Sequence, residues 1–266
     1  MSSNPITIKE DMNFLDYPNW IVSNKETSTV LRLTMKNDNG FYEMKSPEGL
    51  PGRFDKVVLY FLIYKMQDNP IKSSEVVTTR YEIAKNVLFQ EKNFSKTKYD
   101  RIMLALKRWK AIYIKFEGIF FERDNHTIKY FSILDFVSLD KKTNKLSIKF
   151  NDQYMKQLEE SNFYRMINFH EYKKLTRPVS ARLYEILTRE FSNSHLWCVD
   201  VMELGERLTL EKRFFPSHIL GSVTPALEEI NQNSTMSISF DYDKKRLLCI
   251  FKKNPSIPPI QQPEKA

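Results

Sequence analysis

Basic and hydroxyl side chains gather along one predicted helix, residues 96–109, and their chemistry is that of nucleic-acid recognition. Lysine and arginine bind phosphate oxygens, and an arginine on an exposed helix face can also bind the edge of a base. Arg101 is the candidate for a base contact, while Lys96 and Lys98 near the helix start are candidates for phosphate contacts. The predicted set on this helix is Ser95, Lys96, Thr97, Lys98, Arg101 and Arg108. The alternative is an ordinary solvated helix face.

The spacing of apolar residues fixes the orientation of this helix. They recur at i, i+3, i+4 and i+7, as on the buried side of an amphipathic helix. The residues predicted to face the core are Tyr99, Ile102, Met103, Leu106 and Trp109. Another face would then carry Lys98, Arg101 and Arg108 around the small Ala105, which would let a groove approach closely.

A second predicted helix, beginning near Pro216, carries a weaker version of the same signal. Lys212 and Arg213 precede it, and its first turns project the polar side chains Ser217, His218 and Ser222. Glu228 and Glu229 bring the local charge near zero, so an ordinary polar face is an equally good interpretation. Pro225 lies inside this helix, which predicts either a kink or a fresh helix start capped by Thr224.

Two predicted hairpin tips add further cations. Residues 140–144 include Lys141 and Lys142, and the last hairpin turns through Asp243, Lys244, Lys245 and Arg246. Such tips are candidates for phosphate contacts beside a recognition helix, and the alternative is an ordinary polar turn. In the first half of the chain, residues 122–126 form another candidate tip, and the sequence leaves open which of the two is the wing.

Charge is concentrated in the same part of the chain. The 266 residues include 41 Lys and Arg against 33 Asp and Glu, a net charge of +8. The window 92–149 alone holds 14 basic against 6 acidic residues, which equals the whole excess. Such a surplus favours an anionic partner, although a solvated surface can also be this basic.

The sequence contains no pattern of a catalytic or metal site. The four histidines are scattered singly, no Gly-rich phosphate loop occurs, and we therefore expect no enzyme activity, no metal and no cofactor. Cys198 and Cys249 lie in strand-like runs and are predicted to be small buried residues of a cytoplasmic protein. The longest apolar run, residues 57–64, is too short to cross a bilayer, so no membrane contact is expected.

Abundant aromatic residues raise the alternative of base stacking on single strands. The candidates alternate within predicted strands, and we predict that they belong to the core instead: Phe116, Phe120, Phe121, Tyr130 and Phe131.

The order of predicted elements indicates an α+β chain built from one unit that occurs twice. Each unit has an apolar helix, a short second helix, a turn, a third helix and a strand hairpin, an arrangement typical of tandem winged-helix (helix-turn-helix plus β-wing) domains. The predicted divisions are an N-terminal arm (1–45), a first winged-helix domain (46–150), a second (151–253) and a Pro- and Gln-rich disordered tail (254–266).

Several stretches in this order resemble plasmid replication initiator proteins of the RepA and RepE type. They are Gly49–Asp55, Arg80–Ile83, Tyr99–Ile102 with Leu106–Arg108, Ser180–Leu187, and Pro225–Asn231. Together they span roughly residues 45–252, and the resemblance implies two winged-helix domains. One departure concerns the second recognition helix, which carries Ser217, His218 and Ser222 where many relatives are basic.

The resemblance implies sequence-specific binding to direct repeats (iterons) in a plasmid origin of a bacterial cytoplasm. It also implies melting of a neighbouring AT-rich segment, recruitment of the host initiator and helicase, and dimers that repress their own gene while monomers initiate. Two alternatives stay open from the residues: a transcriptional regulator that binds an inverted-repeat operator, and a protein-interaction module.

Overall fold

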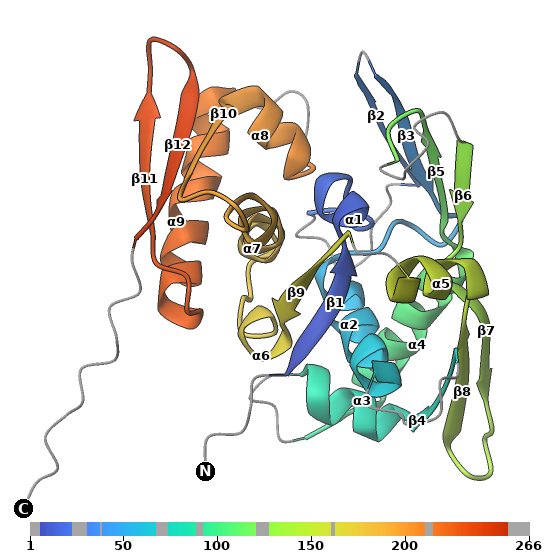
Figure 1. The fold of residues 1–266 in the computed structure, drawn as a ribbon. Helices are drawn as coiled ribbons and strands as arrows, with labels where there is room; N and C mark the ends of the chain where they lie inside the picture. Colours follow the sequence, from blue (N-terminus) through green and yellow to red (C-terminus); the bar gives the residue numbers. More distant parts are fainter. Residues whose placement is uncertain are drawn as a thin grey trace, which may run out of the picture.

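The computed structural model describes residues 6–22, 31–37, 39–67, 74–88, 93–120, 128–160, 163–210 and 215–254. The fold is a mixture of helices and antiparallel sheets, as predicted. Figure 1 shows two groups of elements side by side, one from residues after about 175 and one from the middle of the chain, with the N-terminal strand β1 between them.

The first group repeats the predicted order of helices and strands. Its three helices pack against one another, and its sheet has the order β4-β8-β7, so the strand before the second helix pairs with the last strand of the hairpin. The elements are α2 (Arg53–Gln67), β4 (Glu75–Thr79), α3 (Arg80–Val87), α4 (Lys96–Ala111), β7 (Leu134–Leu139) and β8 (Lys145–Phe150).

The second group has the same order. Its sheet runs β10-β12-β11, in which the strand before the second helix again pairs with the last strand of the hairpin. In Figure 1 the tips of the β7–β8 and β11–β12 hairpins point in opposite directions. The elements are α7 (Pro178–Glu190), β10 (Leu196–Asp200), α8 (Val201–Arg207), α9 (Pro216–Asn233), β11 (Ile238–Asp243) and β12 (Leu248–Lys253).

A four-stranded antiparallel sheet is inserted into the first group. It has the order β2-β3-β5-β6, and its strands are β2 (Arg32–Asn37), β3 (Gly40–Lys45), β5 (Tyr113–Glu117) and β6 (Ile128–Phe131). A Cβ on Gly40 would collide with the carbonyl oxygen of Glu117, so the close approach of β3 and β5 requires glycine there.

This sheet resolves two predictions. Of the two candidate tips, residues 140–144 join β7 to β8 and so belong to the sheet that contains β4. The other candidate, residues 122–126, lies outside the described residues, and the strands before and after it belong to the four-stranded sheet. Phe116, Phe120 and Phe131 are buried as predicted, and Phe121 lies outside the described residues. Tyr130 is half exposed, so its assignment to the core was wrong.

Residues 6–22 of the stretch predicted as an N-terminal arm pack between the two groups, whereas its last part supplies β2 and β3. β1 (Thr7–Asp11) pairs antiparallel with β9 (Tyr164–Asn168), and α1 (Met12–Asp16) contacts α7. The short helices α5 (Asp152–Glu160) and α6 (Phe169–Tyr172) flank this strand pair. Residues 6–22 therefore contact both halves of the chain.

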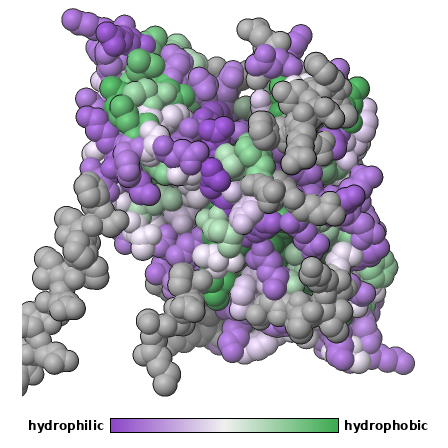
Figure 2. Space-filling view, in the orientation of Figure 1, coloured by the Kyte–Doolittle hydropathy of each residue, from purple (hydrophilic) through white to green (hydrophobic). Residues whose placement is uncertain are grey.

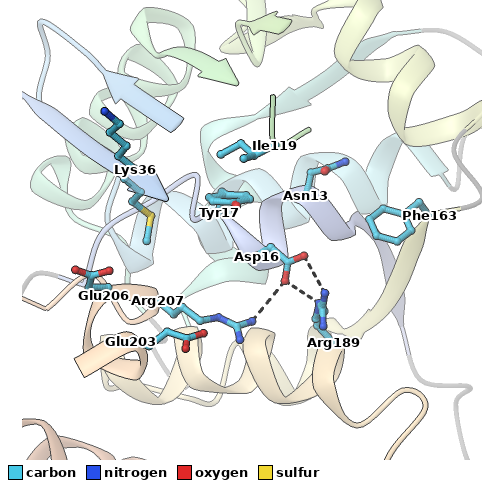
Figure 3. Close-up of a pocket in the computed structure, with 11 residues that line it drawn as sticks. Asn13, Asp16, Tyr17, Lys36, Ile119, Phe163, Arg189, Glu203, Glu206 and Arg207 are labelled. Atoms are coloured by element: carbon cyan, nitrogen blue, oxygen red, sulfur yellow. Dashed lines mark hydrogen bonds and ion pairs between the residues drawn. The ribbon is translucent and has the colours of Figure 1, made fainter. Parts of the chain in front are cut away.

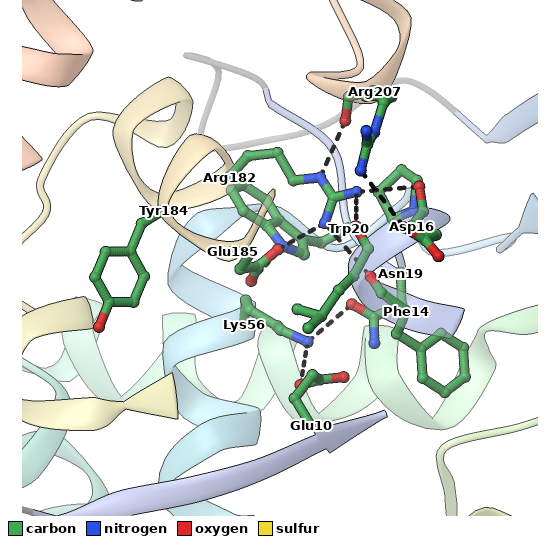
Figure 4. A network of polar contacts seen from close by, with 12 residues as sticks. Glu10, Phe14, Asp16, Asn19, Trp20, Lys56, Arg182, Tyr184, Glu185 and Arg207 are labelled. Atoms are coloured by element: carbon green, nitrogen blue, oxygen red, sulfur yellow. Dashed lines mark hydrogen bonds and ion pairs between the residues drawn. The ribbon is translucent and has the colours of Figure 1, made fainter. Parts of the chain in front are cut away.

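A buried polar network ties these parts together (Figure 4). The fully buried guanidinium of Arg182 in α7 donates to Glu185 Oε2 at 2.8 Å and to the carbonyl of Leu15 at 2.8 Å. Glu185 also accepts from Trp20 Nε1 at 3.1 Å and from Tyr60 OH at 3.2 Å. One carboxylate thus collects donors from the N-terminal stretch, from α2 and from α7.

A second buried ion pair lies beside it. Lys56 Nζ in α2 donates to Glu10 Oε2 at 2.9 Å and to Asn19 Oδ1 at 3.0 Å. Burial raises the pKa of Glu10, although Lys56 opposes the shift. Buried charges of this kind fix the geometry of the elements that carry them, because separating the partners would leave an unpaired charge in the interior.

Asp55 lies in the first turn of α2, where its carboxylate accepts from Gly52 N at 2.8 Å. Of the two alternatives for Pro225, the structure excludes the fresh start at Thr224, because α9 runs through Pro225 as one helix. One local prediction needs correction. Cys198 is exposed, because β10 alternates and buries the neighbouring Val199 instead, whereas Cys249 is buried as predicted.

Candidate nucleic-acid interface

The start of α4 presents a polar, cationic end to the surface. Ser95, Lys96 and Thr97 are exposed, and Ser95 occupies the N-cap position without a side-chain capping hydrogen bond. Lys98 Nζ donates to the carbonyl oxygen of Asn93 at 2.9 Å, which holds its ammonium group over the preceding turn. A helix N-terminus with lysines beside it favours anions, because the free amide groups of the first turn and the lysine ammonium groups both attract negative charge.

Arg101 lies one turn further along α4 and is also exposed. Its guanidinium carbon stands 4.1 Å from the centroid of the Phe54 ring, so a ring at the start of α2 supports the side chain from one side. Stacking on an aromatic face orients the planar guanidinium while its edge can still donate hydrogen bonds. The sequence pattern did not identify Phe54, which no spacing relates to Arg101.

Arg108 is not part of this surface, so its prediction as a nucleic-acid contact is wrong for this conformation. Its side chain is buried, with Nη1 donating to Asp55 Oδ2 at 3.0 Å and Nε to the carbonyl of Glu48 at 3.2 Å. Ala105 is buried as well. The helix spacing was right, but the start of α2 and the loop before it cover the C-terminal half of α4. Burial raises the pKa of Asp55, although Arg108 and Gly52 oppose the shift.

The tip of the β7–β8 hairpin exposes Lys141 and Lys142. Asp140 organises the turn, because its carboxylate accepts from Lys142 N at 2.8 Å and from Thr143 Oγ1 at 2.6 Å. These bonds, led by that from Thr143, lower the pKa of Asp140. Asn144 closes the turn in the left-handed region, with φ of 56°. Two ammonium groups therefore stand at the end of a well-defined turn.

The tip of the β11–β12 hairpin has the same construction. Asp243 accepts from Lys245 N at 2.9 Å and from Arg246 N at 3.2 Å, and Leu247 closes the turn with φ of 55°. Lys244, Lys245 and Arg246 are exposed. Both turns therefore begin with an Asp-Lys-Lys sequence and end, at the fifth residue, in the left-handed conformation. In Figure 2, hydrophilic surface covers both tips, at upper left and lower right.

The start of α9 differs from that of α4. Ser217 and His218 are exposed as predicted, but the hydroxyl of Ser222 donates to the carbonyl of His218 at 2.9 Å. Lys212 and Arg213 lie outside the described residues. Phe215, which the sequence pattern passed over, is 68% exposed at the N-cap, with its ring centroid 5.9 Å from that of His218. An aromatic residue so exposed at a helix start is a signal of its own.

A cleft of about 660 Å³ lies between α1, β2 and α8 (Figure 3). Asp16 pairs with Arg189 at 2.7 Å and with Arg207 at 3.4 Å, so the two guanidinium groups are engaged by a carboxylate. Its charged lining is balanced, with three acidic and three basic side chains: Asp16, Glu203, Glu206, Lys36, Arg189 and Arg207. This balance makes the cleft a poor phosphate site compared with the two tips.

Among the described residues, no group of three or more His, Cys, Asp or Glu side chains is placed to hold a metal ion. Within the same residues, no helix has the length and apolar character needed to cross a membrane.

Comparison with known proteins supplies a family. The family model described as replication initiator protein A matches residues 9–214, which is more than three quarters of the chain. A search of curated proteins finds no match.

Solved structures with a similar fold are also found. Domains 2 and 3 of RctB give a TM-score of 0.63 at 11% identity, over 92% of this chain and 98% of theirs. The Pi initiator protein, solved in complex with iteron DNA, gives a TM-score of 0.61 at 13% identity, over 94% of this chain and 98% of its own.

Proposed function

The chain belongs to the replication initiator protein A family, and we propose that it binds duplex DNA at a replication origin through two winged-helix units. The proposed units are α2–β8 (residues 53–150) and α7–β12 (residues 178–253). The second begins later than the boundary at 151 expected from the sequence, and α5, β9 and α6 between them pack against β1. Each unit contains three helices and a sheet in which the strand before the second helix pairs with the last strand of the hairpin. In this interpretation α4 and α9 are the recognition helices, and the two hairpins are the wings.

The observation that carries the proposal is the repeated wing turn. Two hairpins far apart in sequence carry the same Asp-Lys-Lys turn, with the same carboxylate-to-amide bonds and the same left-handed closing residue. Folding alone does not require lysine at these exposed positions. Paired ammonium groups on two matching tips suit contact with two stretches of phosphate backbone.

The proposed contact surface is limited to side chains that are exposed or near the helix starts. Arg101 would bind a base edge, and the remaining residues would bind phosphates or water-mediated sites. In the first unit these are Ser95, Lys96, Thr97, Lys98, Arg101, Lys141 and Lys142. In the second unit they are Ser217, His218, Ser222, Lys244, Lys245 and Arg246.

Direct repeats are the proposed target, because the Pi initiator protein of similar fold was solved on iteron DNA. The proposal extends to initiation of plasmid replication in a bacterial cytoplasm, together with autorepression, homodimer formation and contact with the host initiator and helicase. These finer parts rest on the family. No catalytic step, metal or cofactor is assigned.

Titration of the purified protein onto its native origin, followed by fluorescence anisotropy, tests the proposal. Scrambled DNA of equal length is the control, and both are measured at two salt concentrations. We expect preference for the origin and a loss on the order of a thousandfold in affinity between 50 and 200 mM salt, if six or more phosphates are contacted. Equal, weak binding to both DNAs would instead support a protein-interaction module.

The orientation of half-sites separates initiator from regulator. Origin fragments with the repeat in direct and in inverted orientation are footprinted with the same protein. We expect cooperative protection of direct repeats and distortion of the neighbouring AT-rich segment. Protection of inverted repeats by a two-fold dimer, without distortion, would favour the transcriptional regulator.

A further inference from the structure

The four-stranded sheet β2-β3-β5-β6 has one face in the core and an outer face that is exposed along the edge strands β2 and β6 and buried at Glu43 in the middle. Alternate residues such as Tyr42, Met44 and Ile114 are fully buried beneath it. The residues between them therefore point to the other side, because neighbouring side chains of a strand face opposite ways. In register, that outer face carries Arg32, Thr34, Lys36, Phe41, Glu43, Lys45, Tyr113, Lys115, Glu117, Ile128 and Tyr130.

Aromatic rings on this outer face lie close together. The rings of Tyr113 and Tyr130, on neighbouring strands, have centroids 5.6 Å apart and planes tilted by 39°. Tyr130 is 50% exposed, and the adjoining Ile128 is 49% exposed. These side chains add nothing to the core, which the opposite face of the same strands supplies.

Cations surround the rings. Lys45 Nζ lies 4.6 Å from the centroid of Tyr113, and Lys115 Nζ lies 5.5 Å from that of Phe41. Four basic side chains stand against two acidic ones on this face, which leaves a surplus of two positive charges. Ion pairs engage three of these cations, since Glu43 pairs with Arg32 and, at 3.8 Å, with Lys45, and Glu117 pairs with Lys115 at 2.7 Å. Unlike the balanced cleft, this face keeps a positive surplus after the pairing.

We propose that this outer face binds single-stranded DNA. The exposed ring of Tyr130 and the partly exposed rings of Tyr113 and Phe41, flanked by lysines, suit a strand whose bases are unpaired, because rings can stack on bases while the cations meet phosphates. A double helix keeps its base faces covered, so such rings gain nothing from intact duplex. Four strands at about 4.8 Å spacing span roughly 14 Å, which accommodates two or three stacked bases.

At an origin, this site would hold one strand of the opened duplex, and that role rests on the proposed function. Binding of single-stranded DNA by this face does not depend on the proposed function. A second copy of the chain is the competing occupant of the face. The surplus of positive charge argues against it, because two identical faces would bring like charges together.

The test is anisotropy of a fluorescent 12-nucleotide oligo(dT), titrated with the full chain in low salt. Wild-type protein binds it, and Tyr130→Ala weakens binding about tenfold through loss of one stacked base. Tyr130→Phe keeps wild-type affinity, because the ring rather than the hydroxyl carries the contact. Leu196→Ala, which truncates an apolar side chain of similar exposure on β10, leaves binding unchanged.

A second variant keeps the test independent of any single ring. Lys45→Ala removes the cation above Tyr113 and should weaken oligo(dT) binding. The slope of log affinity against log salt concentration should also fall by the contribution of about one phosphate contact. Origin duplex is titrated with the same variants, and its affinity should not change. If the wild-type protein binds oligo(dT) but does not bind origin duplex, the proposed function is rejected and the single-strand site still stands.

Two results would overturn the inference. One is wild-type oligo(dT) affinity in both Tyr130→Ala and Lys45→Ala. The other is a change of sedimentation from dimer to monomer in Tyr130→Ala with oligo(dT) binding intact, which would assign the face to a second copy.

Discussion

The two halves of the molecule share their construction but differ at the helices that would read bases. Their wing tips match residue for residue in the Asp-Lys-Lys turn and in its closing left-handed residue. The helix starts do not match, since α4 offers Lys96, Lys98 and Arg101 while α9 offers an exposed phenylalanine beside serine and histidine. Under the proposed function, both halves would therefore bind phosphates in the same way, whereas α4 and α9 would contact bases with different side chains.

The interiors of the halves differ too. In the first, α4 is held by the buried pair of Arg108 and Asp55. In the second, α8 and α9 approach so closely that a Cβ on Gly205 would come within 2.6 Å of Ile219 Cδ1. A buried ion pair therefore adds to the apolar packing of α4, whereas a glycine allows the close packing of α8 and α9.

Trp109→Ala should have the largest effect and tests how α4 is held. The ring is fully buried and its Nε1 donates to the carbonyl of Asp55 at 2.7 Å. We expect a loss of roughly 3–5 kcal/mol in the free energy of unfolding, measured by urea denaturation. Phe215→Ala, at the exposed start of α9, is the control and should change stability by no more than about 0.5 kcal/mol. An unchanged urea midpoint in Trp109→Ala would refute the inward assignment.

Arg182→Met tests the junction on which both halves depend. It leaves Glu185 buried without its cationic partner, and we expect a loss of roughly 3–5 kcal/mol in urea denaturation. Arg189→Met removes a partly exposed partner of Asp16 and should cost about 1 kcal/mol or less. Equal costs for the two variants would mean that the buried network does not join the halves.

Arg101→Ala sharpens the contrast between the recognition helices. Affinity for the origin should fall by roughly 1–3 kcal/mol, with little change on scrambled DNA, because a base contact is lost. Lys98→Ala should weaken binding to both DNAs alike. Lys107→Ala is the matched control, since that lysine pairs with Glu48 at 2.9 Å. Parallel losses on both DNAs for Arg101→Ala would remove its base-reading role.

The wing tips can be compared by removing one lysine pair at a time. Lys141→Ala with Lys142→Ala, and separately Lys244→Ala with Lys245→Ala, should each flatten the logarithmic salt dependence of binding by about 1.8, at about 0.9 for each phosphate contact. Anisotropy across a salt series measures the slope. If only one double variant changes it, the tips are not equivalent despite their shared turn.

Glu229→Gln should have the smallest effect. Glu229 of α9 caps the start of α7, accepting from Thr176 N at 2.7 Å and from Arg177 N at 3.2 Å. Partial burial alone would raise its pKa, but hydrogen bonds from the side chains of Ser180 and Thr176 and from these two amides outweigh burial and hold the pKa below its ordinary value. The stabilisation is therefore present above pH 4.5 and is lost as pH falls through the lowered pKa.

We expect this variant to cost roughly 0.5–1 kcal/mol at pH 7, as for a charge at a helix N-terminus. The difference from wild type in urea denaturation should shrink toward pH 3. A difference that stays constant between pH 7 and pH 3 would contradict the charge-based cap.

Local patterns predicted much of this molecule. Thr79 and Asp200 have the short polar side chains typical of helix N-caps, and they cap α3 and α8 by satisfying the first free amides of each helix. The apolar spacing of α4 identified Ile102, Leu106 and Trp109 as buried. Pro225 left two alternatives open, and the structure selects the continuous helix, because a helix supported along its length by packing tolerates a missing hydrogen bond.

The sequence by itself determined the repeated order of elements, the inward stripe of α4 and the cationic tips, because each depends on neighbours within a few residues. Only the tertiary structure decided that Arg108 is covered, that Phe54 supports Arg101 and that Tyr130 faces outward. It also decided that Glu10, Trp20, Lys56 and Glu185 meet in one buried network. Those outcomes depend on contacts between segments tens to more than a hundred residues apart, and no local spacing encodes which segment covers which face.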